Sequence, residues 1–405
     1  MTAHFPSRHP AERVVGTEAA SRRHGAEANH LLTLLTAGDP LADAVIAELD
    51  LHGTRARRAL DAGLENGLAS LDDEPPTAVA ALLAQLETTP SWIDPLMLHR
   101  GDVVSLSVPP MWFTLCSITS ALAHTYASPA TARQLARTGR PTAMAAPRLA
   151  SAGVWARQTV RPGGLLRGGP GYLATVQVRL HHARTRARAV ADWNTGAEGL
   201  PTGRLDLTRT WLGFTLIAFQ ALAAVGIDIG PEEERSLYRY WSYVAHLLGL
   251  DESLHKELAN HDDARRLQSL LDAATPTPSG DSRVLTAAMV DAQARATAGA
   301  AGEEMTEEQV RLLIHSVLRR AFGAEWGDHL GIPPVSAATD PMPLISRLNR
   351  QARYWQTYSA ASAQAARRQA VEEPGPGPEP IAVVLPLGVA FQRSAGVRRS
   401  GTPAA

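Results

Sequence analysis

The sequence is poor in cysteine, lysine and aromatic residues, and each shortage excludes a kind of site. Its single cysteine, Cys116, excludes an internal disulfide framework and any metal site built from Cys-x-x-Cys pairs. Lys256 is the only lysine, so positive charge rests on arginine, which stays charged and binds carboxylates through two hydrogen bonds. Aromatic residues make up 5% of the 405 residues, so we expect a core built mainly of leucine, alanine and valine.

Long apolar runs are absent as well. No run approaches the roughly 18 apolar residues that a membrane-spanning helix needs. The pair Arg22-Arg23 is followed by polar residues, whereas a twin-arginine export signal continues into an apolar stretch. We therefore expect a cytoplasmic protein without a membrane span.

Acidic residues are missing from one long block of the chain. Between Asp102 and Asp192 there is no Asp or Glu but there are eleven arginines, so the block carries +11 and the remainder −12, which together give the net charge of −1. These arginines are Arg133, Arg137, Arg140, Arg148, Arg157, Arg161, Arg167, Arg179, Arg184, Arg186 and Arg188. The block must be balanced by an external anion or by acids from the rest of the chain.

The composition of this block argues against nucleic acid as the anion. Only Trp155 and Tyr172 are interleaved with its arginines, which is few for base stacking, and much of the block is too apolar for a groove-binding surface. Arginines within an apolar helical bundle fit a smaller, buried dianion better. The two propionates of a haem, with a histidine on the iron, meet that description.

Helical periodicity dominates the sequence and strand-like alternation is rare, so we predict an all-α fold. Asp39-Pro40 is typical of a helix start, and the following helix is predicted to end at Gly53. Further helices are predicted at about 55–67, 77–86, 111–126, 129–139, 206–225, 231–248, 306–323 and 344–368. We expect a flexible N-terminal arm (1–30), a single helical domain (31–370) and a disordered tail rich in proline and glycine (371–405).

Two adjacent histidines, His181 and His182, lie on a further predicted helix inside the arginine block. Neighbouring residues on a helix point about 100° apart, so the two cannot bind one metal from the same face. Either could be a single axial ligand, and both could instead face water on a surface helix. Periodicity alone does not decide between these alternatives.

Other candidate sites are incomplete. Glu252-x-x-His255 matches half of a ferritin-like metal motif, but the sequence holds no second copy. The glycine-rich stretch 161–171 lacks the Lys-Ser/Thr ending and the preceding strand of a phosphate-binding loop, so we interpret it as a connector. No Gly-x-Ser-x-Gly elbow supports a hydrolase triad. Cys116 lies in an apolar stretch and is interpreted as a packing residue.

The order and spacing of several short motifs resemble the latex-clearing protein family of haem b oxygenases. The motifs are Leu135-Ala-Arg-Thr-Gly-Arg140, Ala146-Pro147-Arg148-Leu149, Pro162-Gly163-Gly164, Gly171-Tyr172 and Val178-Arg179-x-x-His182-Ala183. The resemblance covers roughly residues 38–358. It implies a globin-like helical core with flanking helices, haem b, and O2-dependent cleavage of a carbon–carbon double bond in a polyisoprenoid chain.

The resemblance also implies roles for individual residues. His182 maps onto the proximal haem ligand of the family, Arg179 onto its neighbour in the haem pocket, and Arg148 onto the distal arginine. Ser151 stands where rubber-cleaving members often carry a lysine, and the distal acid of such enzymes has no counterpart here. We therefore expect Arg148 and Ser151 to hydrogen-bond to O2, and Arg179 to hold a propionate or to orient His182.

Three hypotheses follow. The first is a monomeric haem b oxygenase that acts with O2 on a hydrophobic, unsaturated, isoprenoid-type molecule. The second is a haem-binding sensor or carrier without turnover. The third is a metal-free helical protein whose arginines contact an acidic partner, and this protein would be colourless when purified.

Overall fold

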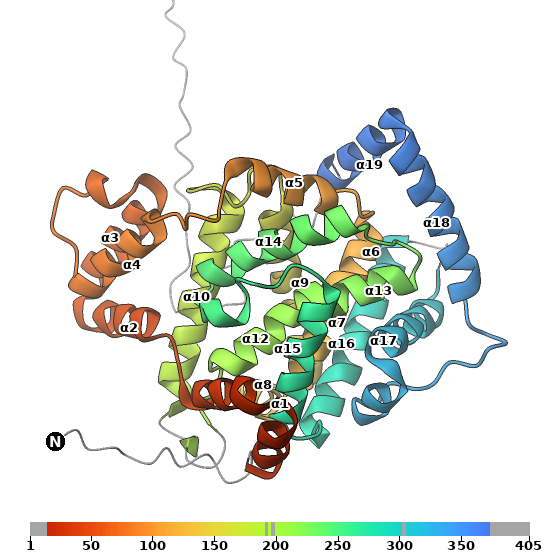
Figure 1. Cartoon of the computed structure of the whole chain (residues 1–405), viewed down its shortest axis with the longest axis horizontal. Helices are drawn as coiled ribbons and strands as arrows, with labels where there is room; N and C mark the ends of the chain where they lie inside the picture. Colours follow the sequence, from red (N-terminus) through yellow and green to blue (C-terminus); the bar gives the residue numbers. More distant parts are fainter. Residues whose placement is uncertain (1–13, 191–192, 196–198, 302–304, 373–405) are drawn as a thin grey trace, which may run out of the picture.

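In this computed structural model the described residues are 14–190, 193–195, 199–301 and 305–372, and their regular elements are all helical (Figure 1). The predicted all-α class is therefore confirmed. In chain order the helices are α1 (Val14–Thr33), η1 (Leu34–Thr36), α2 (Pro40–His52), α3 (Thr54–Asn66), η2 (Leu68–Ser70), α4 (Thr77–Glu87), α5 (Pro95–Ser105), α6 (Pro110–Trp112), η3 (Phe113–Thr119), α7 (Ser120–Tyr126), α8 (Pro129–Arg137), α9 (Pro141–Val160), α10 (Pro170–Ala189), α12 (Arg204–Leu212), η5 (Gly213–Ile217), α13 (Ala218–Ala224), α14 (Pro231–Leu247), η6 (Glu252–Leu254), α15 (His261–Ala273), α16 (Gly280–Ala301), α17 (Glu307–His329), α18 (Met342–Tyr358) and α19 (Ala360–Glu372).

The start of α2 follows from local sequence signals. The Asp39 side chain accepts a hydrogen bond from the Ala42 backbone N–H at 3.1 Å, and Pro40 occupies the first turn, where its missing N–H costs nothing. Gly53, with φ 55°, ends the helix as predicted. Helices α2, α3 and α4 lie together at one side of the molecule (Figure 1).

The expectation of a flexible arm over residues 1–30 is wrong from Val14 onward. Residues Val14–Thr33 form α1, which bends at Gly25 (φ 59°). The helix packs against α15 and its last turns are apolar, with Ala28, Leu31 and Leu32 buried. Burial of this end stabilises a helix that the polar composition of the segment concealed. Residues 1–13 and 373–405, which include most of the expected tail, lie outside the described residues.

Several aromatic residues pack against one another in the core. The ring centroids of Trp155 and Phe214 are 4.9 Å apart, and Phe214 stacks on Trp241 at 5.9 Å. The Trp211 indole N–H donates to the Trp241 carbonyl at 2.8 Å. The wider core is mainly leucine, alanine and valine, as expected, and this aromatic cluster lies within it.

Two long helices contain π-helical turns that the periodicity did not reveal. The predicted helix at 111–126 consists of α6, η3 and α7, and the one at 206–225 consists of α12, η5 and α13. The two rods touch at Gly213, where a Cβ atom would lie 2.9 Å from the Ala121 Cα. Glycine is therefore required at this crossing, because any side chain would push the rods apart.

Helix α5 and the apolar rod α6–α7 meet at a sharp bend of 99°. By length and composition this bent pair could cross a membrane, whereas no single helix within the described ranges is long and apolar enough to do so. Asp102 of α5 is buried and accepts hydrogen bonds from the Tyr240 hydroxyl and the Gly163 N–H, both at 2.9 Å. It thereby connects α5 with α14 and with the glycine-rich stretch. That stretch links α9 to α10, as a plain connector does.

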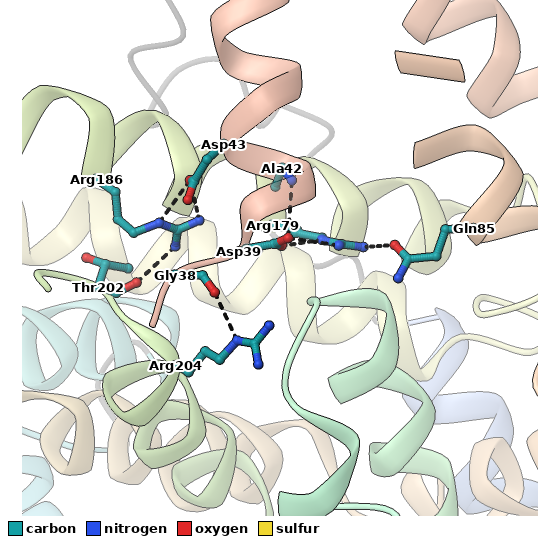
Figure 2. A network of polar contacts seen from close by, with 9 residues as sticks. All are labelled: Gly38, Asp39, Ala42, Asp43, Gln85, Arg179, Arg186, Thr202 and Arg204. Carbon is teal, nitrogen blue, oxygen red and sulfur yellow. Dashed lines mark hydrogen bonds and ion pairs between the residues drawn. The ribbon is translucent and has the colours of Figure 1, made fainter. Parts of the chain in front are cut away.

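The arginine block is balanced in part by acids from elsewhere in the chain. Three arginines of α10 reach across to α2, and one arginine of the glycine-rich turn reaches α4. The pairs are Arg179–Asp39, Arg184–Asp50, Arg186–Asp43 and Arg167–Glu87. Figure 2 shows the first and third of them. Charge segregation along the sequence therefore becomes charge pairing between helices.

We predict that Asp39→Asn destabilises the protein by about 3–5 kcal/mol, because it leaves the buried Arg179 charge without its counter-ion. Asparagine caps helices as well as aspartate does, so the substitution isolates the ion pair from the cap. The matched control is Asp50→Asn in the Arg184 pair, where Asp50 is 61% exposed and the cost is less than about 1 kcal/mol. Urea unfolding of the two variants measures the difference, and equal destabilisation would contradict the prediction.

Candidate cofactor site between helices α9 and α10

Helices α9 and α10 lie side by side in antiparallel register. The Trp155 indole N–H donates to the Thr175 hydroxyl at 3.1 Å. One turn further along, a Cβ atom on Gly171 would lie 2.6 Å from the Thr159 Cα, which gives the same register. This close approach explains why the start of α10 carries glycine.

The register places Arg148 opposite His182. Residues seven apart lie on nearly the same face of a helix. Arg148 precedes Trp155 by seven positions, and His182 follows Thr175 by seven. Because Trp155 and Thr175 contact each other, the Arg148 and His182 faces point toward one another, roughly 10 Å along the helices from that contact.

Five side chains of α9 and α10 have a buried polar atom that makes no hydrogen bond within the described part of the chain. They are Nδ1 of His181 and of His182, Nη1 of Arg148, Oγ of Ser151 and Oε1 of Gln158. Nearly all buried polar atoms in folded proteins are paired, so a cluster of exceptions marks a place where a ligand completes the structure. Three of these five, His182, Arg148 and Ser151, are site residues predicted from the sequence, and the helix register turns the Arg148 and His182 faces toward each other.

Neighbouring helices position Arg148. Its Nη2 donates to the Leu135 carbonyl at 2.7 Å and to the Thr138 hydroxyl at 2.8 Å, which ties α9 to the end of α8. Tyr126 of α7 is buried next to the same guanidinium; burial raises the Tyr126 pKa, and the Arg148 charge opposes that rise. Arg148 is therefore held on one side and leaves its second terminal nitrogen for the interface.

The pattern of unsatisfied atoms continues onto α8. Arg186, next to His182, donates to the Thr202 carbonyl at 2.9 Å, and the Thr202 hydroxyl donates to Gln134 Oε1 at 2.6 Å. The Nε2 atom of Gln134 and the hydroxyl of Thr131 are buried and make no hydrogen bond with the residues described. The region of unused polar groups therefore spans α8, α9 and α10.

Both histidines are neutral at neutral pH. Burial lowers the pKa of His182 well below its usual value, and His181 and Arg186 lower it further. Burial and Arg188 lower the pKa of His181 to about 4. Neutral imidazole is the form that binds metals. Of the two, His182 lies on the Thr175 face that is turned toward α9, and His181 points about 100° away from it.

These residues fit a haem better than a metal ion bound only by protein. Across the described ranges, no three His, Cys, Asp or Glu side chains come together as a metal site. A metal on His182 must therefore bring most of its other ligands, as the porphyrin of haem does. The donors of Arg148 and Ser151, on the facing helix, are then available for a small molecule at the metal.

Arg179 is engaged by the protein itself. It is 3% exposed, donates from Nε to Asp39 at 2.5 Å, and donates from Nη1 to Gln85 at 3.0 Å (Figure 2). Its guanidinium is thus directed at α2 and α4, whereas the sequence predicted a hold on a propionate or an effect on His182. The ion pair with Asp39 anchors α10 one turn before His182, and the role of Arg179 stays a prediction.

The Glu252–His255 pair does not converge on a common point. Glu252 lies 3.5 Å from His246 and 3.8 Å from Lys256, at the surface. His255 is fully buried between Trp92 and Trp211, and neither ring nitrogen has a hydrogen-bond partner in the described structure. Burial lowers the pKa of His255 to about 3, with His246 as a further cause.

Sequence reasoning missed a second group of residues, which surrounds a cavity of about 1140 Å³. Its wall includes His124 of α7 and Arg209 of α12, both buried, and none of His182, Arg148 or Ser151. No local motif marks His124 or Arg209. Their proximity depends on how α7 and α12 pack together, which the sequence does not reveal.

Among solved structures, that of latex clearing protein LCP in the closed state is similar to this chain. The TM-score is 0.56, the sequence identity is 17%, and the match covers 83% of this chain and 91% of that chain. No family model and no curated protein matches the sequence. The likeness confirms the predicted latex-clearing-protein-like, all-α fold. The globin-like core and the residue assignments stay predictions.

The buried histidines predict an acid-sensitive fold, and His255→Leu tests this. Since the folded-state pKa of His255 is about 3, the unfolded chain binds a proton there below pH ~6.5 that the folded chain does not. Stability is therefore lost as pH falls from about 6.5 toward 4, by about 1.4 kcal/mol per pH unit for each such histidine.

His255→Leu should reduce the slope of the unfolding free energy against pH by the contribution of one histidine. The control His52→Leu, at an exposed position, should leave the slope unchanged. Urea unfolding at pH 7, 6 and 5 measures both slopes. A His255→Leu slope equal to that of the wild type would show that His255 is protonated in the folded protein.

Proposed function

We propose that this protein is a haem b-dependent oxygenase that uses O2 to oxidise or cleave a carbon–carbon double bond of a hydrophobic, isoprenoid-type substrate. One observation carries the proposal. Across the interface of α9 and α10, His182 Nδ1, Arg148 Nη1 and Ser151 Oγ are buried without partners among the described residues. The fold in which they lie is similar to that of latex clearing protein LCP.

His182 is the residue that would hold the haem iron. Its low pKa keeps the ring neutral and ready to bind a metal. Its helix is fixed to α2 on either side of it, by Arg179 to Asp39 and by Arg186 to Asp43. When bound, haem supplies the redox chemistry with O2 that amino-acid side chains lack.

Arg148 and Ser151 would bind O2 from the facing helix. The Leu135 carbonyl and the Thr138 hydroxyl already orient the guanidinium of Arg148, so Nη1 is a fixed donor for an oxygen atom that carries partial negative charge. Ser151 adds a neutral hydroxyl. It is also smaller than a lysine and carries no amine, so it leaves room for O2 and for an apolar substrate.

The proposal predicts the absorption spectrum of the purified or haemin-reconstituted protein. We expect a Soret band in the wild type that disappears in His182→Ala, because the histidine that would hold the haem iron is lost. The adjacent His181→Ala is the matched control and should keep the band. A colourless wild type after haemin addition, or loss of the band in His181→Ala alone, would refute the assignment.

Arg148→Gln tests the role of the distal donor. We expect it to keep the Soret band and to lower olefin-dependent O2 consumption by a factor of about 100 or more, the usual cost of removing one preorganised donor. An oxygen electrode with a short polyisoprenoid olefin measures the rate. If the wild type binds haem but consumes no O2 with any such olefin, the haem sensor or carrier becomes the better description.

A further inference from the structure

A second candidate site is the cavity of about 1140 Å³ whose walls come from α7, α12, η5, α13, α15, α17 and α18. Its volume is that of a large small-molecule pocket. The residues proposed to hold haem do not line it. The cavity is therefore independent of the proposed haem site, and its contents can be tested in protein without haem.

The inner end of the cavity is a buried, hydrogen-bonded polar group. Arg209 is 2% exposed and donates from Nη2 to Asp272 at 2.9 Å and to Thr275 at 3.1 Å. His124 Nδ1 lies 2.9 Å from the Arg209 carbonyl, which can only accept, so Nδ1 carries the proton. The other nitrogen, Nε2, then accepts from Arg209 Nη1 at 3.3 Å.

This arrangement makes the inner wall rigid and close to neutral. Burial and the Arg209 charge lower the pKa of His124 to about 3, so the ring is uncharged, and Asp272 offsets the charge of Arg209. Phe322 stacks on His124 with ring centroids 6.0 Å apart, and Trp326 lies 5.9 Å from the Arg209 guanidinium carbon. Between these two aromatic residues, Gly323 with φ 80° interrupts α17.

Much of the remaining lining is apolar. Aliphatic side chains come from three helices and from the start of a fourth. They include Leu216, Ile217, Ala224, Ala273 and Met342. Together with the two aromatic rings, this surface suits a hydrocarbon chain or ring system and offers it few hydrogen bonds.

Charge in the lining is predominantly positive. Four lining arginines face two lining acids, Asp272 and Glu325, which gives an excess of two positive charges when histidines are counted as neutral. The acids that pair with Arg265, Arg320 and Arg350 lie outside the lining. Arg265 and Arg350 are 53% and 58% exposed, and their ion-pair partners Asp262 and Asp228 are more exposed still. Exposed pairs of this kind are weak, so both guanidiniums can exchange partner for a carboxylate.

We propose that this cavity binds an amphipathic carboxylate, with the hydrocarbon body against the aliphatic and aromatic walls and the carboxylate on Arg265 or Arg350. The buried Arg209 remains paired with Asp272 and is not the anchor. An uncharged hydrocarbon would leave the arginine excess unused. A small hydrophilic anion would leave the apolar walls uncovered.

The test is a fluorescence titration of haem-free protein with a C18 conjugated tetraene carboxylic acid, which becomes fluorescent in apolar surroundings. We expect saturable binding of one molecule per chain. The methyl ester of the same probe should bind about tenfold more weakly or worse, a loss of about 1.4 kcal/mol, because the charge-assisted hydrogen bonds to arginine are gone.

Two variants separate the head group from the body. The double variant Arg265→Gln/Arg350→Gln should weaken acid binding about tenfold and leave ester binding unchanged. Ala224→Phe, which fills the cavity, should weaken both probes. The matched controls on the exposed face of α16, away from the lining, are Arg295→Gln and Ala296→Phe, and they should change neither. Circular dichroism and thermal melting show that each variant is folded.

Three outcomes would overturn the proposal. They are the absence of saturable fluorescence, equal affinity for acid and ester, and acid binding that the arginine double variant does not weaken. The arginine variants change only exposed side chains, so this last outcome remains decisive even if Ala224→Phe fails to fold. Haem content does not enter any of these readouts, so failure here is distinguishable from failure of the oxygenase proposal.

Discussion

The buried ion pair between Arg179 and Asp39 fixes the position of α10, and the candidate cofactor site depends on that position. The Asp39 carboxylate accepts a hydrogen bond from the Ala42 N–H in the first turn of α2 while it pairs with Arg179, so one carboxylate caps α2 and anchors α10. The turn after α14 closes over the same pair at Gly249 (φ 74°), where a Cβ atom would clash with Asp39 Oδ2 and the Arg179 Nε. Two charges removed from water in this way stabilise only one geometry, because any shift leaves a buried charge unpaired.

Much of the fold could be predicted because its signals are local. The cap at Asp39, the proline and acids at the start of α14 and the capping box at Thr306 each lie within a few residues of the helix that they begin. Helix α15 has a similar signal in Asn260, which accepts a hydrogen bond from the Asp263 N–H, yet it was not predicted. Helix α16 was also missed. Its buried face mixes alanine with the polar residues Ser282, Thr286 and Gln293, which gives weak hydrophobic periodicity.

The residues of the candidate site could be proposed from the sequence, but their geometry could not. The local sequence places His182 next to His181 and does not decide which of the two would bind a metal. The contact of Trp155 with Thr175 provides the register that turns His182 toward Arg148, and no motif encodes that contact. The counter-charge of Arg179 lies 140 residues away at Asp39, so the sequence could not decide between an internal acid and an external anion.

The two candidate sites differ in how they satisfy their buried charges and polar atoms, and this difference determines how each would bind. At the α9–α10 interface, Arg148, Ser151 and His182 retain buried polar atoms without partners in the described structure, so a ligand there restores hydrogen bonds or coordination that folding has removed. In the cavity, the buried Arg209 already has Asp272, Thr275 and His124. The exposed arginines at the second site lose few hydrogen bonds when no ligand is present, because water can reach them. We therefore expect a tightly held prosthetic group at the first site and reversible binding at the second.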